Sequence, residues 1–463
     1  MKFSRRRFLE IAAAAGGGLA VKSWSAPAPP RTGDQLLLLV HFSGGWDQLL
    51  ALDPRPNNDP RFSSAQAYSA NGSGIYPAYD RVVDPTVQAL LSADPRGVQY
   101  AGNLSFGPAV PQALLQHAGD LSIVRGVIMG TLTHEVGRDY FLTGKFPRGL
   151  TPNGSSLNTV VAGRAGETKD IPNLSVATES YNEGWPAFAS AIRVNSVGDL
   201  LPALRPLGAE LAPATDGALA DYEAAAETCE TRAYDSEGLV SLFRASRARS
   251  RALKSSQASA LFDFNLTNPG PEVQPLFDAL GIGAAADLRG IKGRAAVAAQ
   301  ALAKGLSQSV GVQLAVGLDD HSDWGVNQAP NLRASFDTLG RLIAYLKAQP
   351  YGGAGETVWQ HTTLLVFSEF ARTPLLNGRG GRDHHLASSC LLAGPGIRGN
   401  LVVGGTTDAA MAARKIDFHT GQPDETGQAV RPCDVHATVL ASMGFSDEHL
   451  SSQSPQVIEA ALR

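Results

Sequence analysis

The segment 361–385 concentrates the residue types of a metal site that handles an anion. It combines carboxylates, guanidinium groups and two adjacent imidazoles around a Gly-rich loop. Mixed carboxylate and imidazole ligands suit Zn, Mn or Fe better than Mg or Ca. A guanidinium can hold two oxygens of a phosphate or sulfate at once. The candidate metal ligands here are Glu369, Asp383, His384 and His385, and the candidate anion-binding residues are Arg372 and Arg382.

Three other segments place similar side chains just after apolar runs. Asp319 and His321 are two residues apart, so in an extended chain both point to one face and can hold one ion. Asp47 follows two glycines that permit a tight turn. His134 and the next residue, a glutamate, resemble the start of the zinc-protease motif H-E-x-x-H, but Arg138 stands where the second histidine is required.

Each of these side chains alone has a structural alternative: a helix cap, an ion-pair partner or a buried histidine. Considered together, Asp319, His321, Glu369 and His384 favour a site, because all four follow predicted strands. A pair of ions there would stabilise the attacking and leaving oxygens of an in-line displacement.

The elements that must position these residues are short apolar runs that read as buried strands. Chemistry in α/β proteins gathers just past the carboxyl ends of such strands. Strands and helices alternate along the chain, which predicts an α/β fold with a mostly parallel central sheet and helices on both faces. We expect strands at 35–42, 121–127, 310–318, 362–367, 390–393 and 401–403, and helices at 331–349 and 434–443.

The predicted organisation is one domain, residues 31–455, preceded by a signal and linker at 1–30. An Ala- and Leu-rich stretch, about 195–305, predicts several helices that pack on the sheet or form an inserted cap. With 463 residues and 43% hydrophobic residues, the chain can bury a large core. We therefore expect a single globular domain with a helical insert.

Composition argues against several classes of protein. The net charge of −4 and the scattered basic residues give no footprint for nucleic acid. One basic run, 244–254, has helical spacing and predicts a solvated helix face. The cysteines Cys229, Cys390 and Cys433 form no CxxC pattern and no disulfide framework, although a single bridge is compatible with them.

The amino terminus has the layout of an export signal. Residues 4–9, Ser-Arg-Arg-Arg-Phe-Leu, resemble a twin-arginine signal, which predicts recognition by the twin-arginine export machinery. The apolar run 11–21 is too short to span a bilayer, which takes roughly 20 residues. Prolines at 27, 29 and 30 obscure the cleavage point. We expect a periplasmic or secreted protein, membrane-tethered if the signal stays uncleaved.

Several motifs together resemble a known family. They are S-E-F-A-R-T-P at 368–374, N-G-R-G-G-R-D-H-H at 377–385, S-G-G-W-D at 43–47 and L-D-D-H at 318–321. Taken in their order along the chain, they resemble a bacterial family of exported proteins of unknown function within the alkaline phosphatase and sulfatase superfamily. The resemblance implies an alkaline-phosphatase-like α/β fold and a two-metal site that hydrolyses phosphate or sulfate esters.

The resemblance also implies roles for individual residues. Asp47 matches the acidic ligand after the first strand, and Glu369 matches the aspartate of an Asp-His pair, with Phe370 in place of that histidine. The implied metal ligands are Asp47, Asp319, His321, Glu369 and either His384 or His385.

Departures from the family pattern leave alternatives open. His134 stands where related phosphoglycerate mutases have their nucleophilic serine, and Thr133 beside it could attack if a metal or a base activated its hydroxyl. Because Phe370 replaces a ligand, the site could hold one ion, or His134 could itself be a ligand. No Cys-x-Pro-x-Arg signature of sulfatases is present.

The sequence therefore predicts an exported hydrolase of phosphate or sulfate esters with one or two divalent ions, Zn or Mn before others. Its substrate would be a small anionic ester or glycan. The alternative is a non-catalytic metal-binding or envelope-associated binding protein that keeps the fold. The sequence leaves the oligomeric state open.

Overall fold

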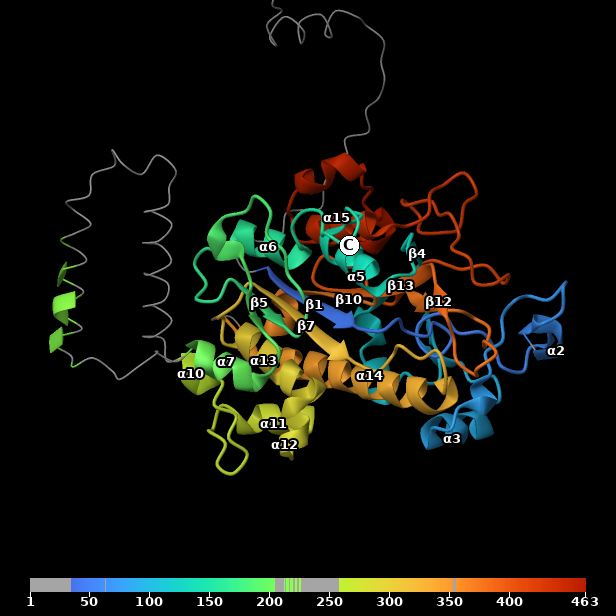
Figure 1. Cartoon of the computed structure of the whole chain (residues 1–463), viewed down its shortest axis with the longest axis horizontal. Helices are drawn as coiled ribbons and strands as arrows, with labels where there is room; N and C mark the ends of the chain where they lie inside the picture. The colour runs from blue at the N-terminus through green and yellow to red at the C-terminus, as the bar shows by residue number, and fades with distance from the viewer. Residues whose placement is uncertain are drawn as a thin grey trace, which may run out of the picture.

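A single eight-stranded sheet forms the centre of the protein (Figure 1). The computed structural model describes residues 35–62, 64–204, 258–352 and 355–463, with isolated residues between 212 and 225. The strand order is β14-β4-β13-β10-β1-β7-β5-β6. Both the predicted export signal, 1–30, and the basic run 244–254 lie outside the described residues.

Every strand of this sheet except β13 points in one direction. β1 pairs in parallel with β10 on one side and β7 on the other, whereas β13 is antiparallel to its neighbours β10 and β4. The predicted mostly parallel α/β sheet is confirmed. The strands are β1 (Leu36–Phe42), β4 (Ser122–Ile128), β5 (Asn173–Val176), β6 (Ile192–Val194), β7 (Ser309–Ala315), β10 (Thr362–Phe367), β13 (Ala387–Ala393) and β14 (Leu401–Gly404).

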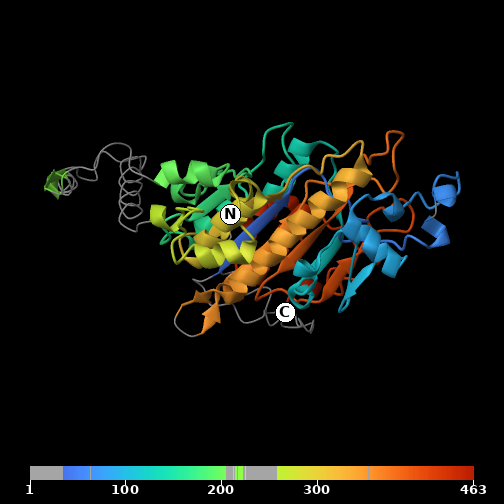
Figure 2. The same cartoon turned by 90° about the horizontal axis from the view of Figure 1, so that it is seen from below.

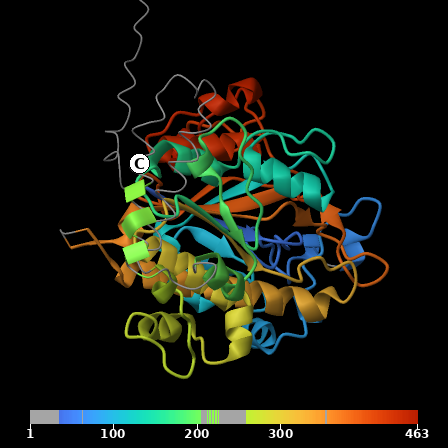
Figure 3. The ribbon, with the colours of Figure 1, turned by 60° about the vertical axis from the view of Figure 1, so that its left-hand side comes forward.

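Helices cover both faces of the sheet because side chains along a buried strand alternate between two cores. In β1, Leu36, Leu38 and Val40 belong to one core, which contains α13 and α14, while Leu37 and Leu39 belong to the other. Figures 1 and 3 show these two layers on opposite sides of the sheet. The first layer contains α13 (Ile291–Ala303) and α14 (Trp324–Ala348), and the second contains α5 (His134–Thr143), α6 (Leu157–Ala165) and α15 (Pro432–Ser442).

The longest helix, α14, crosses the face of the sheet (Figure 2). The sequence predicts this helix only from residue 331 onward, and Pro330, which lacks a helical N–H donor, stands directly before that range. The structure extends the helix through Pro330 to Trp324, whose buried side chain anchors its first turn. Tertiary packing of that tryptophan outweighs the helix-breaking tendency of the proline.

The described part of the stretch 195–305 is helical. It contains α7 (Val197–Leu204), α10 (Ala258–Leu261), α11 (Gln274–Leu280), α12 (Ala285–Arg289) and α13. α13 packs directly on β7, with Ala295, Val297 and Leu302 in the same core as the strand. The division into a domain and a helical insert stays a prediction, since part of the stretch lies outside the described residues.

The described chain settles two smaller points. Cys390 and Cys433 are buried and free. Within the described residues, no helix has both the length and the apolar content needed to cross a membrane.

Candidate metal centre

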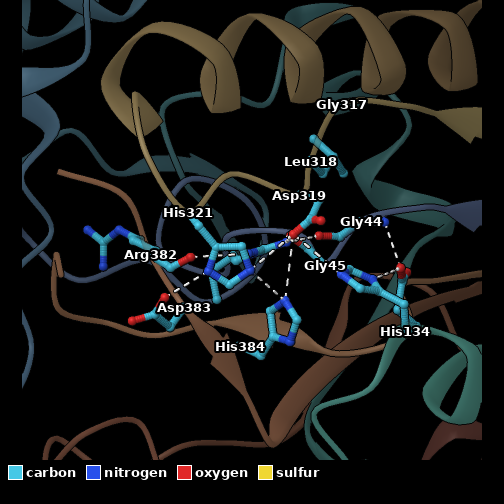
Figure 4. A network of polar contacts seen from close by, with 12 residues as sticks. Gly44, Gly45, His134, Gly317, Leu318, Asp319, His321, Arg382, Asp383 and His384 are labelled. Atoms are coloured by element: carbon cyan, nitrogen blue, oxygen red, sulfur yellow. Dashed lines mark hydrogen bonds and ion pairs between the residues drawn. The ribbon is translucent and has the colours of Figure 1, made fainter. Parts of the chain in front are cut away.

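The candidate site lies where several strands end on one edge of the sheet (Figure 4). Asp319 and His321 follow β7, Glu369 follows β10, and His134 begins α5 after β4. His384 reaches the same place through a short antiparallel pair, β11 (Ala371–Arg372) with β12 (His384–His385). Parallel pairing of β1, β7 and β10 thus brings distant segments of the sequence together.

One oxygen of Asp319 is the common neighbour of three imidazoles. Its Oδ1 lies 3.3 Å from Nε2 of His134, 3.3 Å from Nε2 of His321 and 3.6 Å from Nε2 of His384. Ligand atoms of His134, Asp319 and His384 all lie within 4.8 Å of one another. These three residues form a group that could hold a metal ion.

Hydrogen bonds orient all three imidazoles toward this point. In each ring, Nδ1 lies at hydrogen-bond distance from an oxygen acceptor, so we assign the proton to Nδ1 and the lone pair to Nε2. A neutral imidazole presents a metal ion with that lone pair. The acceptors are Glu369 Oε1 for His134 at 2.8 Å, Asp383 Oδ1 for His321 at 2.7 Å and the Leu132 carbonyl for His384 at 2.5 Å.

The lone pairs have no satisfactory partner within the protein. Nε2 of His134 is buried and makes no hydrogen bond. Nε2 of His321 and Nε2 of His384 face each other at 3.0 Å, where two lone pairs repel unless a proton or cation lies near them. Ligands of a tetrahedral ion with bonds of about 2.0–2.1 Å lie about 3.3 Å apart. The residues present therefore fit a divalent ion.

Glu369 positions His134 and is not a ligand in this arrangement. Its carboxylate is buried, and burial acts to raise its pKa, but hydrogen bonds with His134 and His41 outweigh burial and hold the pKa far below its usual range. Conversely, burial acts to lower the pKa of His134, and the Glu369 carboxylate raises it above the ordinary value. Four groups contact this carboxylate: His41 Nε2 at 3.1 Å, the Gly44 N–H at 2.7 Å, His134 Nδ1 at 2.8 Å and the Ser368 hydroxyl at 3.1 Å.

His41 is the positioning residue that sequence reasoning missed. It lies inside β1, buried and stacked on Phe367, with ring centroids 4.9 Å apart. Its Nε2, however, contacts the same carboxylate as His134. The available signal was its position near the end of β1, directly before the S-G-G-W-D turn.

The guanidinium of Arg372 bonds to other groups of the protein and is therefore not free to bind an anion. Its side chain is fully buried, and Nη2 donates to Asp319 Oδ1 at 2.7 Å. Its remaining donors bind the backbone carbonyls of Gly44, Gly45 and Arg382. Burial acts to raise the pKa of Asp319, and the Arg372 hydrogen bond lowers it below the ordinary value.

Asp47 and Arg382 form a buried pair away from the centre. Arg382 Nε lies 3.0 Å from Asp47 Oδ2, which also accepts a hydrogen bond from Trp324 Nε1 at 2.7 Å. The other oxygen of Asp47 accepts from the backbone N–H groups of Leu49 and Leu50. The sequence placed both residues in the site; the structure gives Asp47 the role of capping a turn and gives Arg382 that of its buried partner.

The remaining candidates border the centre. His385 turns away, with Nε2 3.0 Å from the Ala410 carbonyl and Nδ1 accepting from the Ala387 N–H. Asp383 is exposed and acts on the centre through His321. Thr133 is the exposed N-cap residue of α5, and its hydroxyl makes no capping hydrogen bond.

Phe370 forms an apolar wall beside two of the imidazoles. Its ring centroid lies 4.2 Å from that of His384 and 4.6 Å from that of His134. A Cβ atom at Gly45, where φ is +78°, would lie 2.6 Å from the Phe370 ring. The glycine therefore lets the turn after β1 approach this wall closely.

A protein family described as "Protein of unknown function (DUF1501)" matches residues 34–456. The chain belongs to this family. No curated protein matches it. The predicted membership of a family of unknown function is confirmed, and the shared stretch includes every residue of the candidate centre.

Solved structures show a distant similarity. One is Ps i-CgsB in complex with k-i-k-neocarrahexaose, with 8% identity, a TM-score of 0.35, and coverage of 92% of this chain and 77% of that chain. Another is the lipoteichoic acid synthase LtaP from Listeria monocytogenes, with 9% identity, a TM-score of 0.35, and coverage of 93% and 75%. At these values the similarity says nothing about activity.

Proposed function

We propose that this protein is a metal-dependent hydrolase of phosphate or sulfate esters with one divalent ion held by His134, Asp319 and His384. The observation that carries the proposal is the convergence of imidazole lone pairs on one carboxylate oxygen, with Nε2 of His134 buried and without a hydrogen bond. A ligand set of two imidazoles and a carboxylate favours Zn, and Mn after it, over Mg or Ca.

Different residues of the chain have different roles in such a site. When bound, the ion would supply Lewis-acid polarisation of an ester oxygen and activation of water. His321 can hold or release a proton at Nε2, since Asp383 orients its ring through Nδ1 at 2.7 Å. Thr133 offers an exposed hydroxyl at the amino end of α5, where the helix dipole favours negative charge.

A non-catalytic metal-binding protein is the second candidate, and a specific observation favours it. Arg372 and Arg382, the predicted anion-binding residues, both have fully buried side chains bound to other groups of the protein. A hydrolase of this kind would then stabilise an anion through the ion and the imidazoles alone. Metal binding without turnover would identify this second function.

The decisive experiment measures metal content and ester hydrolysis on the same preparations. We expect wild-type protein to contain about one Zn or Mn per chain and to hydrolyse p-nitrophenyl phosphate or sulfate. We expect His134→Ala and His384→Ala to lose both properties while remaining folded. His361→Ala is the matched control, because His361 pairs with Glu356 at 2.9 Å outside the site. Wild-type protein without metal, or ligand variants with unchanged metal, would refute the proposal.

A further inference from the structure

An unusual group of apolar side chains borders the centre in the described chain. We call it the apolar rim: Leu132, Phe146 and Leu386. These side chains are between 45% and 48% exposed. Single exposed apolar residues are ordinary, but a group of them in one place marks a surface that binds something.

Backbone contacts connect the members of the rim. The Met129 N–H donates to the Leu386 carbonyl at 3.0 Å. A Cβ atom at Gly130 would lie 3.5 Å from the Phe146 ring, which also packs on Tyr140 with ring centroids 5.2 Å apart. The loop between β4 and α5 therefore lies beside both Leu386 and Phe146.

The rim adjoins the centre through two of its members. The carbonyl of Leu132 accepts the hydrogen bond that fixes His384. Leu386 follows His384 and His385 directly in the chain. An ion at the centre would attract an anionic group, and an apolar chain attached to that group would reach the rim.

We propose that the ligand of the centre is an amphiphilic anionic ester, whose charged head binds at the metal and whose alkyl or aryl part covers the apolar rim. This inference rests on the proposed function and specifies its substrate class. The adjacency of rim and centre favours a small amphiphile over a protein, because a protein seated on the rim would block the approach of any substrate.

The test compares two probes by isothermal titration of zinc-loaded protein: dodecyl phosphate below its micelle concentration and methyl phosphate. We expect dodecyl phosphate to bind at least about tenfold more tightly, since burial of each CH₂ group contributes favourably. Leu386→Ser and Phe146→Ser should each reduce this preference with unchanged zinc content. Tyr100→Ser is the matched control, because Tyr100 is also an exposed apolar side chain but lies on a separate hairpin, in β2 (Gln99–Ala101).

Several outcomes would overturn the inference: equal affinities for the two probes, a preference that survives metal removal by EDTA, or a preference that the rim variants do not change. Self-association that both rim variants abolish in sedimentation velocity would assign the rim to a second copy of the chain. A metal-dependent preference in a protein that hydrolyses no ester would refute only the hydrolase activity. These results separate the substrate class from the proposed function.

Discussion

Among single residues, Glu369 has the greatest influence on the candidate centre without entering it. Its carboxylate accepts the hydrogen bond that keeps the lone pair of His134 on Nε2. Such carboxylate–imidazole pairs raise the basicity of the ligand and fix the orientation of its ring. The same carboxylate contacts His41, which links the core of the sheet to the centre.

We expect Glu369→Gln to weaken metal binding by about 10–100-fold, the usual effect of removing such a partner. The amide keeps the size of the side chain but removes the charge that favours His134 as a ligand. Competition with a chromogenic chelator at neutral pH would measure the loss. Glu356→Gln is the control, since Glu356 pairs with His361 instead. Equal zinc affinity in Glu369→Gln and wild type would contradict this role.

The depressed pKa of Glu369 predicts a pH dependence of stability. The folded state keeps this group ionised below its ordinary pKa of 4.5, so its contribution is fully present above that value. It is lost as the pH falls from about 4.5 toward the lower folded pKa. Urea unfolding of metal-free protein between pH 7 and 3 should therefore show a steeper loss in wild type than in Glu369→Gln. Parallel curves would contradict the assignment.

At this scale the sequence predicted which residue types gather at the candidate centre better than it predicted their orientation. Asp319, His134 and His384 meet at the centre, as their residue types and positions suggested. Asp47 also follows a strand, yet its carboxylate turns inward to cap backbone N–H groups and to bind Trp324. The direction of a side chain after a strand depends on its contacts with distant segments. The spacing of residues in the sequence does not reveal those contacts.

At the scale of elements, the first turn of α5 decides whether His134 reaches the centre. α5 packs so closely on the end of β10 that a Cβ atom at Gly137 would lie 2.4 Å from the Glu369 carbonyl oxygen. Only glycine permits this approach. The close contact brings His134 within hydrogen-bond distance of Glu369.

We expect Gly137→Ala to displace this turn, to cost about 1–3 kcal/mol of stability as overpacked sites typically do, and to lower zinc affinity. Thermal unfolding with and without zinc would separate the two effects. Gly119→Ala is the control, because a Cβ atom there would meet nothing within 4 Å. Unchanged stability in Gly137→Ala would mean that α5 has room to shift.

The elements themselves were predictable where the sequence is unambiguous. β1 and β10 are continuous apolar runs, and their predicted ranges agree with the structure within a residue. β5 and β6 were missed, because each is only three or four residues long and lacks a distinctive pattern. The reversed direction of β13 depends on the path of the chain around the Gly-rich loop, not on its own residues.

At the scale of the whole molecule, the parallel sheet is what makes the centre possible. Residues as distant in sequence as His134, Asp319 and His384 converge because their strands or loops end on one edge. Two cores, one on each face, pack against the strands that end there. The family match, residues 34–456, includes both cores and the centre.

Export through the twin-arginine machinery remains a prediction, and it can be tested on the full chain. We expect Arg5→Lys combined with Arg6→Lys to abolish transfer to the periplasm, because lysine keeps the charge but lacks the planar guanidinium of arginine. Cell fractionation and immunoblotting would measure the exported share. Arg31→Lys is the control, since Arg31 follows the predicted signal and linker, residues 1–30. The exported share of the double variant should fall to background while its zinc content, measured on the retained protein, equals that of wild type. Continued export of the double variant would exclude the twin-arginine route.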